Sequence, residues 1–431
     1  MPWKVSVSLL MLPLCVPAAP QQPGDRTFAV NDLIQAAFER NLELRAVRQR
    51  AVEARGLLRQ AGVRPASSLQ FGGATGSPLR SPGKEEYSAA YSQPIELGGK
   101  RDKRIQVAGI GVGLAEADLA EQTLRLATEI KLRYLDAVTE QARLAALHRL
   151  IGTYRESLKL LEARVRQGDA APLESQLLLV EVSRAEAQKR TVAGRIQVAL
   201  SDLRRLCGFG GLESLLLAGE VRLGGNPSYT LADLQRQAVE QRPDLHAARL
   251  EAERGSAEVS LTEAQGRPDV TLSAQYALKN DRIGDLYGTT ASGQPAALRD
   301  RDNILSFGVS IPLLTCRKNL GNMEAATARA VGSRTLRQHL EASIPLEVEA
   351  AWQHWNAAAQ SLTILDTGVL RQSEKNLDVI RQAYALGQLR LIDVLNEQRR
   401  LIDTQMTYID VESDVRRGLI ELERVVGGDL K

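Results

Sequence analysis

The sequence of 431 residues contains an internal duplication whose period is about half the chain. A repeat of this length constrains the architecture more than any local pattern, because each half must fold as a copy of one structural unit. We expect a first unit at residues 20–213, a linker at 214–228 and a second unit at 229–431. Four anchors recur in the same order: Val30-Asn31-Asp32-Leu33 with Leu231-Ala232-Asp233-Leu234, Arg64-Pro65 with Arg267-Pro268, Pro94 and Lys100 with Pro312 and Lys318, and Leu206-Cys207-Gly208 with Val425-Val426-Gly427.

Heptad patterns open both halves and predict helices that pack as coiled coils. The segment from Arg101 to Gln167 contains no proline and predicts one helix on the order of 100 Å long. Helices expected at about 31–64 and 173–207 are each roughly half that length, so together they match it and indicate a rod. The alternative is an ordinary amphipathic helix facing a core. The seam residues are Leu44, Val47, Ala51, Ala54, Leu58 and Ala61, and in the second half Leu245, Ala248, Ala252, Gly255, Val259 and Thr262.

Between the helices the hydrophobic period changes from about 3.5 to about 2, which predicts strands. In the clearest case Leu305, Phe307 and Val309 share one face. Each strand is close to the roughly ten residues that cross a bilayer when tilted. We expect four of them, at about 66–77, 84–95, 268–279 and 303–313.

Four strands alone cannot close a sheet in a membrane. Their edges would leave backbone groups unpaired in hydrocarbon at several kcal/mol each. Two, three or four copies would supply about 8, 12 or 16 strands and close a barrel. The alternative is a pair of soluble hairpins packed on helices. The segments 76–84 and 280–301 are rich in Gly, Pro, Ser and Asp, and we expect them to be solvated loops.

The amino terminus has the pattern of an export signal. Lys4 precedes an apolar run that ends at Leu14, and small residues follow, so we expect a signal peptide at 1–19. Cys15 is a candidate lipidation site, although Leu14 is larger than the residue that such sites prefer. No stretch reaches the roughly 20 apolar residues of a membrane-spanning helix, so a membrane role has to use strands.

Composition and motifs argue against an enzyme and against nucleic acid as a partner. The net charge is only +3, and Lys and Arg are mixed with Asp and Glu rather than gathered in blocks. The four histidines lack metal-ligand spacing. Gly98-Gly99-Lys100 lacks the Ser or Thr that follows the lysine in a phosphate loop. We therefore expect no catalytic residue, no cofactor and no metal site.

The segment Gln93–Arg101, with the sequence QPIELGGKR, resembles the strand-to-helix junction of TolC-like outer-membrane efflux proteins in their cation (heavy-metal) efflux branch. The doubled layout resembles that family over nearly the whole chain. The resemblance implies a mainly α-helical fold with a membrane β-barrel part. It also implies a homotrimer, in which four strands per subunit form a shared twelve-stranded barrel that continues into a long coiled-coil tunnel. The resemblance also implies a small mixed domain around the middle of the tunnel, with 209–230 and the carboxy terminus as candidates.

The same resemblance implies a function and a location. The chain would lie in the outer membrane of a Gram-negative bacterium, extend into the periplasm and act as a passive exit duct for metal cations or small toxic compounds. Its expected partners are the lipid bilayer, a periplasmic adaptor protein and an inner-membrane efflux pump, for which the resistance-nodulation-division type is the candidate. The sequence does not identify the exported compound or the pump.

Residues at the helical tip are also implied by the resemblance. Tyr384 is expected to meet Glu174 as a constriction, and Asp393 to form an acidic ring at the pore mouth. Asn396 stands where the family has a second acid, and Arg390 is displaced by one position from the family's basic residue. The turns at Gly168, Gly387 and Arg390 are expected to contact the adaptor, and the alternative is that these charges are simply solvated.

A second class of function is compatible with the helical pattern. A periplasmic coiled-coil adaptor or scaffold protein would bind other proteins without forming a pore. The two strand pairs, each followed by a long helical hairpin, favour the duct over this alternative.

Overall fold

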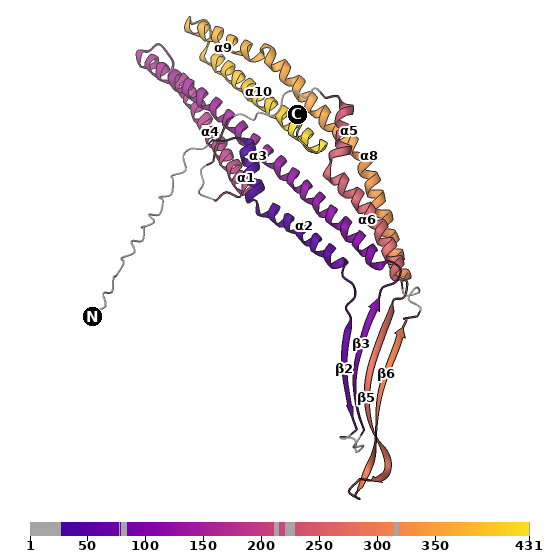
Figure 1. Ribbon diagram of the computed structural model, residues 1–431. Coiled ribbons are helices and arrows are strands. Elements are labelled where there is room, and N and C mark those ends of the chain that lie inside the picture. The colour runs from indigo at the N-terminus through magenta and orange to yellow at the C-terminus, as the bar shows by residue number, and fades with distance from the viewer. Residues whose placement is uncertain are drawn as a thin grey trace, which may run out of the picture.

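The computed structural model describes residues 27–76, 78, 84–210, 215–219, 229–313 and 319–430. The expected signal peptide, Cys15 and most of the expected linker at 214–228 lie outside these ranges. The described chain is elongated, with helices at one end and a four-stranded sheet at the other (Figure 1). Among the described residues, none of the helices combines the length and apolar character needed to span a bilayer.

The elements follow the same order in both halves. The first half consists of β1 (Thr27–Phe28), α1 (Val30–Arg40), α2 (Leu42–Ala61), β2 (Ser68–Thr75), β3 (Glu85–Ile95), α3 (Lys100–Gln167), α4 (Pro172–Cys207) and β4 (Leu216–Leu217). The second half consists of α5 (Leu231–Gln241), α6 (Pro243–Gln265), β5 (Val270–Thr289), β6 (Pro295–Ser310), α8 (Leu320–Ile364), the π-helix η2 (Leu365–Val369), α9 (Leu370–Ala385) and α10 (Leu391–Val426).

The duplication extends to backbone angles. The helix expected at 31–64 is interrupted at Asn41, where φ and ψ are −62° and 121°. The second half has the same break at Arg242, with −63° and 122°. At each break the side chain donates to a carbonyl near the end of the last helix of its half. Asn41 reaches Leu206 at 2.9 Å and Arg242 reaches Val425 at 3.4 Å.

One residue distinguishes the two long helices. Pro94 and Pro312 are 218 residues apart, whereas Gly168 and Gly387 are 219 apart. The extra residue is taken up between these anchors, where α8 passes through η2 and Gly368 has a φ of 134°. Because the backbone angles of Gly368 are non-helical, two helices meet here across a kink, and this kink accommodates the additional residue. By contrast, α3 runs for 68 uninterrupted residues.

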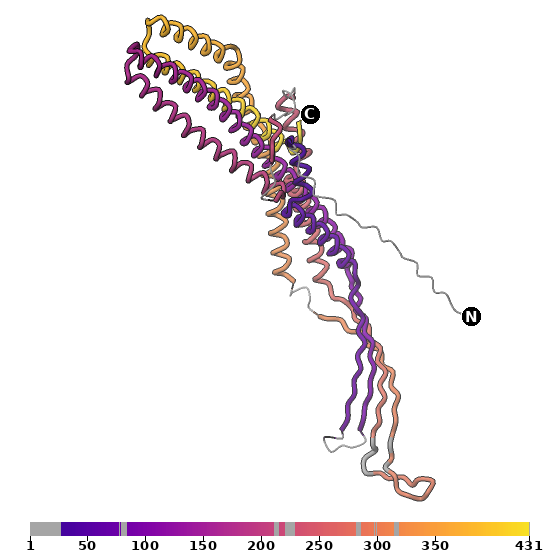
Figure 2. Tube along the Cα trace, turned by 90° about the vertical axis from the view of Figure 1, so that its left-hand side faces the viewer, coloured from indigo at the N-terminus to yellow at the C-terminus, as the bar shows by residue number. Residues whose placement is uncertain are grey.

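The four long strands form an antiparallel sheet in the order β2-β3-β5-β6 (Figure 2). Tyr91 lies opposite both Leu69 and Ala274, so one face carries the apolar residues of all four strands. In the described part of the chain β2 and β6 are the edges, and each pairs on one side only. Phe71 on β2 is 78% exposed and Val309 on β6 is 67% exposed.

The second hairpin differs from expectation. Most of the expected loop at 280–301 is strand, because β5 and β6 continue to pair past Asn280 and Arg301 with an irregularity between Arg282 and Tyr287. The turn is closed where Thr290 donates its backbone N–H to the carbonyl of Gln294 at 2.9 Å. The polar composition of this segment predicted a solvated loop. Strands that face solvent can also form cross-strand hydrogen bonds, so polar composition does not exclude a hairpin.

The Gln93–Arg101 segment forms the corner between sheet and helices. Gly98 and Gly99 have positive φ angles of 76° and 68°, which glycine adopts without steric cost. The turn directs the buried Lys100 toward the second half, where its ammonium donates to the carbonyl of Arg267 and to Asp269, both at 2.7 Å. Lys100 therefore links the strand-to-helix junction of the first half to the helix-to-strand junction of the second half.

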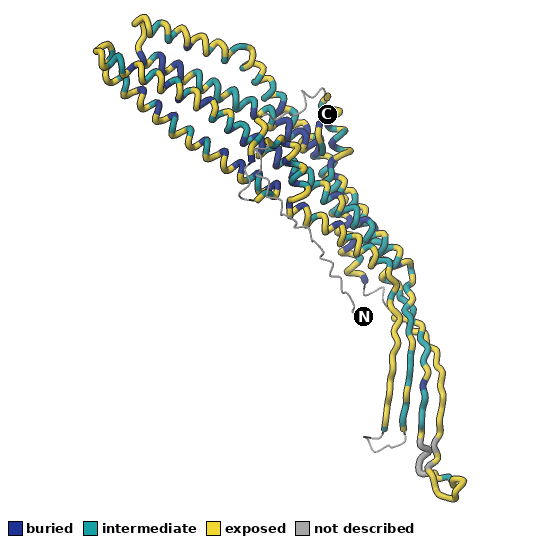
Figure 3. The backbone as a smooth tube through the Cα atoms, turned by 60° about the vertical axis from the view of Figure 1, so that its left-hand side comes forward, coloured by how far each residue is buried: buried dark blue, intermediate teal, exposed yellow. Residues whose placement is uncertain are grey.

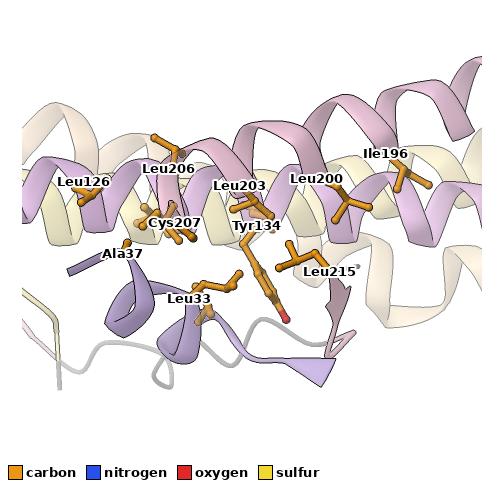
Figure 4. Close-up of a cluster of buried hydrophobic side chains, with 14 of the residues drawn as sticks. Leu33, Ala37, Leu126, Tyr134, Ile196, Leu200, Leu203, Leu206, Cys207 and Leu215 are labelled. Atoms are coloured by element: carbon orange, nitrogen blue, oxygen red, sulfur yellow. The ribbon is translucent and has the colours of Figure 1, made fainter. Parts of the chain in front are cut away.

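The core lies in the middle of the helical part, where buried residues concentrate (Figure 3). One cluster joins α1, α3 and α4 around the fully buried Tyr134, with Leu33 and Leu203 against it (Figure 4). A matching cluster in the second half joins α5, α8 and α10. A short parallel pairing of β1 with β4 covers the first cluster, at the place where a small mixed domain was expected.

A buried ion pair joins the two halves. Lys131 on α3 donates to Glu423 on α10 at 2.8 Å and to Asp429 at 2.5 Å. Burial alone would lower the pKa of Lys131, but the two carboxylates outweigh it and the pKa is raised. The stabilisation is therefore present below the unfolded-state pKa of about 10.4, and it is lost as the pH rises through the raised folded-state value.

Replacing Lys131 tests how much this ion pair contributes to the free energy of unfolding. Lys131→Met should lower the free energy of unfolding by about 3–5 kcal/mol, because it leaves the Glu423 carboxylate buried without its partner. Thermal unfolding of the purified protein, followed by circular dichroism, measures the effect. Arg50→Met is the matched control, because the Arg50–Asp118 pair is exposed and should contribute under about 1 kcal/mol. Equal losses in the two variants would contradict the assigned role.

Candidate functional site: the tip of the helical end

Two helix-to-helix turns lie together at the end of the molecule opposite the sheet (Figures 1 and 2). Gly168 ends α3 with a φ of 85°, and Gly387 follows α9 with a φ of 74°. Each turn is closed by a backbone bond of 2.9 Å, from Asp169 to Arg164 and from Gln388 to Ala383. Such closure with positive φ is characteristic of a glycine that ends a helix. The two turns are repeat equivalents, and so are Glu174 and Asp393, each the third residue of the following helix.

The structure brings Tyr384 and Glu174 together. The phenol of Tyr384, at the end of α9, lies close enough to Glu174 at the start of α4 and to Arg164 at the end of α3 for both charges to act on its pKa. The guanidinium carbon of Arg164 lies 5.7 Å from the centre of the Tyr384 ring, within the range of a cation–π contact. Burial, followed by the charge of Glu174, raises the pKa of Tyr384. The neutral phenol therefore persists at neutral pH and is lost only as the pH rises through that raised value.

Asp393 has a structural role at the same tip. Its carboxylate accepts the backbone N–H of Arg390 at 3.0 Å, while the N–H of Asp393 donates to the carbonyl of Arg390 at 3.0 Å. A carboxylate in the first turn also interacts favourably with the helix dipole. Asp393 is half-buried, whereas Asn396 and Arg390 are exposed. Asp393 therefore begins α10 and still presents its negative charge at the tip.

Contacts behind the turns were not predicted from the sequence. Glu181 on α4 accepts two hydrogen bonds from Arg399 on α10, one of them at 3.3 Å. The nearby Tyr154 is buried among Leu161 and other apolar residues that join α3, α4 and α10. Only the position of Arg164, one turn before Gly168, carried a sequence signal, since basic residues favour the last turn of a helix.

Among the cavities along the described helices, two lie near the contacts described above. One of about 260 Å³ lies beneath Tyr384 and is lined by apolar residues with Arg164 and Arg381. A larger one of about 840 Å³ opens between α3, α4 and α10 and is lined mainly by charged residues. In the larger one Arg143 bridges Glu140 and Asp410. Within the described ranges, no three His, Cys, Asp or Glu side chains are placed together as a metal site.

Comparison with known proteins gives this geometry a context. The sequence profile of the outer membrane efflux protein family matches residues 33–209 and again 234–428. The cobalt-zinc-cadmium resistance protein CzcC of Cupriavidus metallidurans is 24% identical over 340 residues, which cover 79% of this chain and 77% of CzcC. The cation efflux system protein CusC of Escherichia coli O157:H7 is 23% identical over 430 residues, which cover 95% and 88% of the two chains.

Solved structures agree in fold. A structure of CusC superposes with a TM-score of 0.74 at 18% identity and covers 95% of each chain. The outer membrane protein VceC of Vibrio cholerae gives 0.72 at 20% identity, with 93% of this chain and 97% of VceC covered. The fold expected from the sequence is therefore confirmed. Because the profile match spans most of both halves, this chain belongs to the outer membrane efflux protein family.

Proposed function

We propose that three copies of this chain form the outer-membrane exit duct of a tripartite efflux system. The observation that carries the proposal is the sheet, in which the edges β2 and β6 are each paired along one side only among the described residues. An unpaired edge in hydrocarbon costs several kcal/mol per backbone group, so neighbouring copies have to supply the missing partners. Three copies of four strands give a barrel of about twelve strands, within the range of outer-membrane barrels.

The helices extend the duct away from the membrane. α3 alone, with 68 residues, spans on the order of 100 Å. Its far end carries the Tyr384–Glu174 contact, and we assign this contact to the closed state of the tip. The exposed turns at Gly168, Gly387 and Arg390 are the proposed contacts of a periplasmic adaptor, which would connect the duct to an inner-membrane pump, with the resistance-nodulation-division type as the candidate.

Metal cations are the favoured cargo. The names of CzcC and CusC refer to metal resistance and cation efflux. Three copies of Asp393 around one axis would concentrate negative potential at a narrow mouth and favour cations there. Asn396 supplies no second acidic ring. Other relatives are named for solvent or pyoverdine export, so small toxic compounds form the alternative cargo, and we assign the choice of substrate to the pump.

Isolating trimers and measuring their conductance tests whether the protein forms a duct. The mature protein should be recovered from outer membranes as a trimer that heating converts to monomer, because strand pairing between copies resists detergent until the barrel unfolds. Reconstitution into a planar lipid bilayer should give single-channel conductance. Recovery of a soluble monomer without conductance would contradict the proposal and favour the adaptor or scaffold alternative.

Removing the Tyr384 hydroxyl tests the closed state. We assign a hydrogen bond between the Tyr384 hydroxyl and Glu174 to the closed state. A hydrogen bond to a charged group contributes about 1.5–3 kcal/mol, so Tyr384→Phe should lower the ratio of closed to open channels roughly tenfold or more. Single-channel recording measures the open fraction. Tyr408→Phe is the control, because Tyr408 lies on α10 away from the tip turns. An unchanged open fraction in Tyr384→Phe would remove this contact from the gate.

Neutralising Asp393 tests the acidic ring. Asp393→Asn keeps an oxygen that can accept the N–H of Arg390, so α10 should still begin at the same place. The variant should need a higher Mg²⁺ concentration for half-maximal block of the current, because the charge at the mouth is gone. Asp169→Asn removes a nearby exposed acid and should leave the block unchanged. Identical block in Asp393→Asn and the parent would exclude Asp393 as a cation site.

A further inference from the structure

The cavity beneath Tyr384 lies between the two helical hairpins of the tip. It has a volume of about 260 Å³ and is lined from all four helices, α3, α4, α9 and α10. The buried side chains Leu161, Leu178 and Leu391 contribute apolar walls. Leu160 also lines the cavity and is 68% exposed, so solvent reaches the cavity at α3.

The charged groups around this cavity are positive. Arg164 and Arg381 line it, and no carboxylate does so among the described residues. Arg381 lies 3.9 Å from Asp378, whose side chain is 70% exposed, so this ion pair is long and weak. Arg164 lies over the ring of Tyr384, and a cation–π contact leaves its positive charge in place. The cavity therefore combines apolar walls with two guanidinium groups.

A buried amide also borders this space. Gln398 on α10 is 4% exposed, and its side-chain amide makes no hydrogen bond with another described residue. A buried amide without a partner is unfavourable, so its partner has to come from the space beside it. Gln398 lines the cavity beneath Tyr384 and a second one of about 230 Å³, and Arg381 lines both as well. Gln398 and Arg381 thus offer hydrogen-bond donors at one place.

We propose that this cavity binds a small aromatic carboxylate, whose rings fill the apolar space and whose carboxylate is held by Arg381 and Gln398. A guanidinium can donate two parallel N–H bonds to a carboxylate, and a glutamine amide adds a further donor. Small-molecule sites typically combine apolar walls with a few polar groups that fix the orientation of the ligand. An organic cation would be repelled by both arginines.

The volume sets the size of the ligand. An apolar cavity of about 150 Å³ holds one benzene ring. The cavity beneath Tyr384, with about 260 Å³, is large enough for two fused rings. We therefore choose 2-naphthoate as the probe and 2-naphthalenemethanol as its uncharged analogue.

A bound carboxylate should favour the closed tip, and this part of the inference rests on the proposed function. Both hairpins line the cavity, so a bound molecule contacts both of them. Separating the hairpins would take the site apart. A ligand that binds one of two states more tightly shifts the population toward that state. The cavity is thus a site at which an aromatic acid regulates opening of the duct.

Isothermal titration of the full-length protein in lipid nanodiscs tests the site, with empty nanodiscs as the blank. 2-Naphthoate should bind once per chain, and Arg381→Met should weaken binding roughly tenfold or more, because a charge-assisted hydrogen bond is lost. Arg371→Met is the matched control, because Arg371 is exposed on the same helix about 15 Å away and should not affect binding. Equal affinity for the acid and the alcohol, or unchanged affinity in Arg381→Met, would overturn the proposal.

Filling the cavity provides a second test. Ser157 lines the cavity from α3 and is half-buried, so the ring of Ser157→Phe should occupy the space of the ligand. Binding of 2-naphthoate should be lost while the temperature of thermal unfolding, followed by circular dichroism, stays within a few degrees of the parent. Undiminished binding in Ser157→Phe would show that the ligand lies elsewhere and would overturn the assignment.

Single-channel recording separates this inference from the proposed function. 2-Naphthoate should lower the open fraction of the parent channel and leave that of Arg381→Met unchanged. A conducting channel that does not bind 2-naphthoate would overturn the site and leave the duct intact. Binding that depends on Arg381 in a protein without conductance would overturn the duct and leave the site intact. Binding to a conducting channel with no change in open fraction would overturn the regulatory role.

Discussion

An antiparallel sheet in hydrocarbon cannot leave an edge unpaired, and the rest of the structure depends on this constraint. Among the described residues β2 and β6 each lack a partner on one side, while Phe71 and Phe307 on the apolar face are 78% and 79% exposed. Each unpaired group would cost several kcal/mol in a bilayer. No rearrangement of the four strands removes both edges, so the fold of one copy is incomplete without its neighbours.

The helical part has a different constraint. It is long and thin, so its helices are held together by a small hydrophobic core. Apolar clusters around Tyr134 and Trp355 occupy the middle of the rod, and a third around Tyr154 lies near the tip, where Leu161 and Leu391 come from different halves. Polar contacts also link the halves, through Lys100 at the sheet and Lys131 in the centre. Such buried charges contribute less to net stability than apolar packing of the same volume. Their geometry is specific, and this specificity fixes the register of one half against the other.

Much of this architecture could be predicted from the sequence, because the hydrophobic period and the spacing of the repeated anchors can be read from it directly. The change from a heptad to an alternating pattern predicted helices and strands, and the anchors predicted the duplication. The break at Asn41 was missed because apolar spacing is uninterrupted there. The Asn41 side chain stabilises it by accepting the backbone N–H of Leu44 and donating to the carbonyl of Leu206. The kink at η2 could be inferred only by comparing the Pro94–Pro312 spacing with the Gly168–Gly387 spacing. The full length of the β5–β6 hairpin was not predicted, because the polar composition of residues 280–301 indicated a loop. At the tip, the dependence of α10 on Asp393 follows from a backbone hydrogen bond that no spacing shows.

The most direct test of the central claim is electron cryo-microscopy of the full-length protein in lipid nanodiscs, because it reports which strand lies beside each edge. The account predicts that β6 of every copy is hydrogen bonded to β2 of the next, so that three chains enclose one continuous cylinder of strands. Hairpins folded back on the helices of their own chain, outside the bilayer, would contradict it.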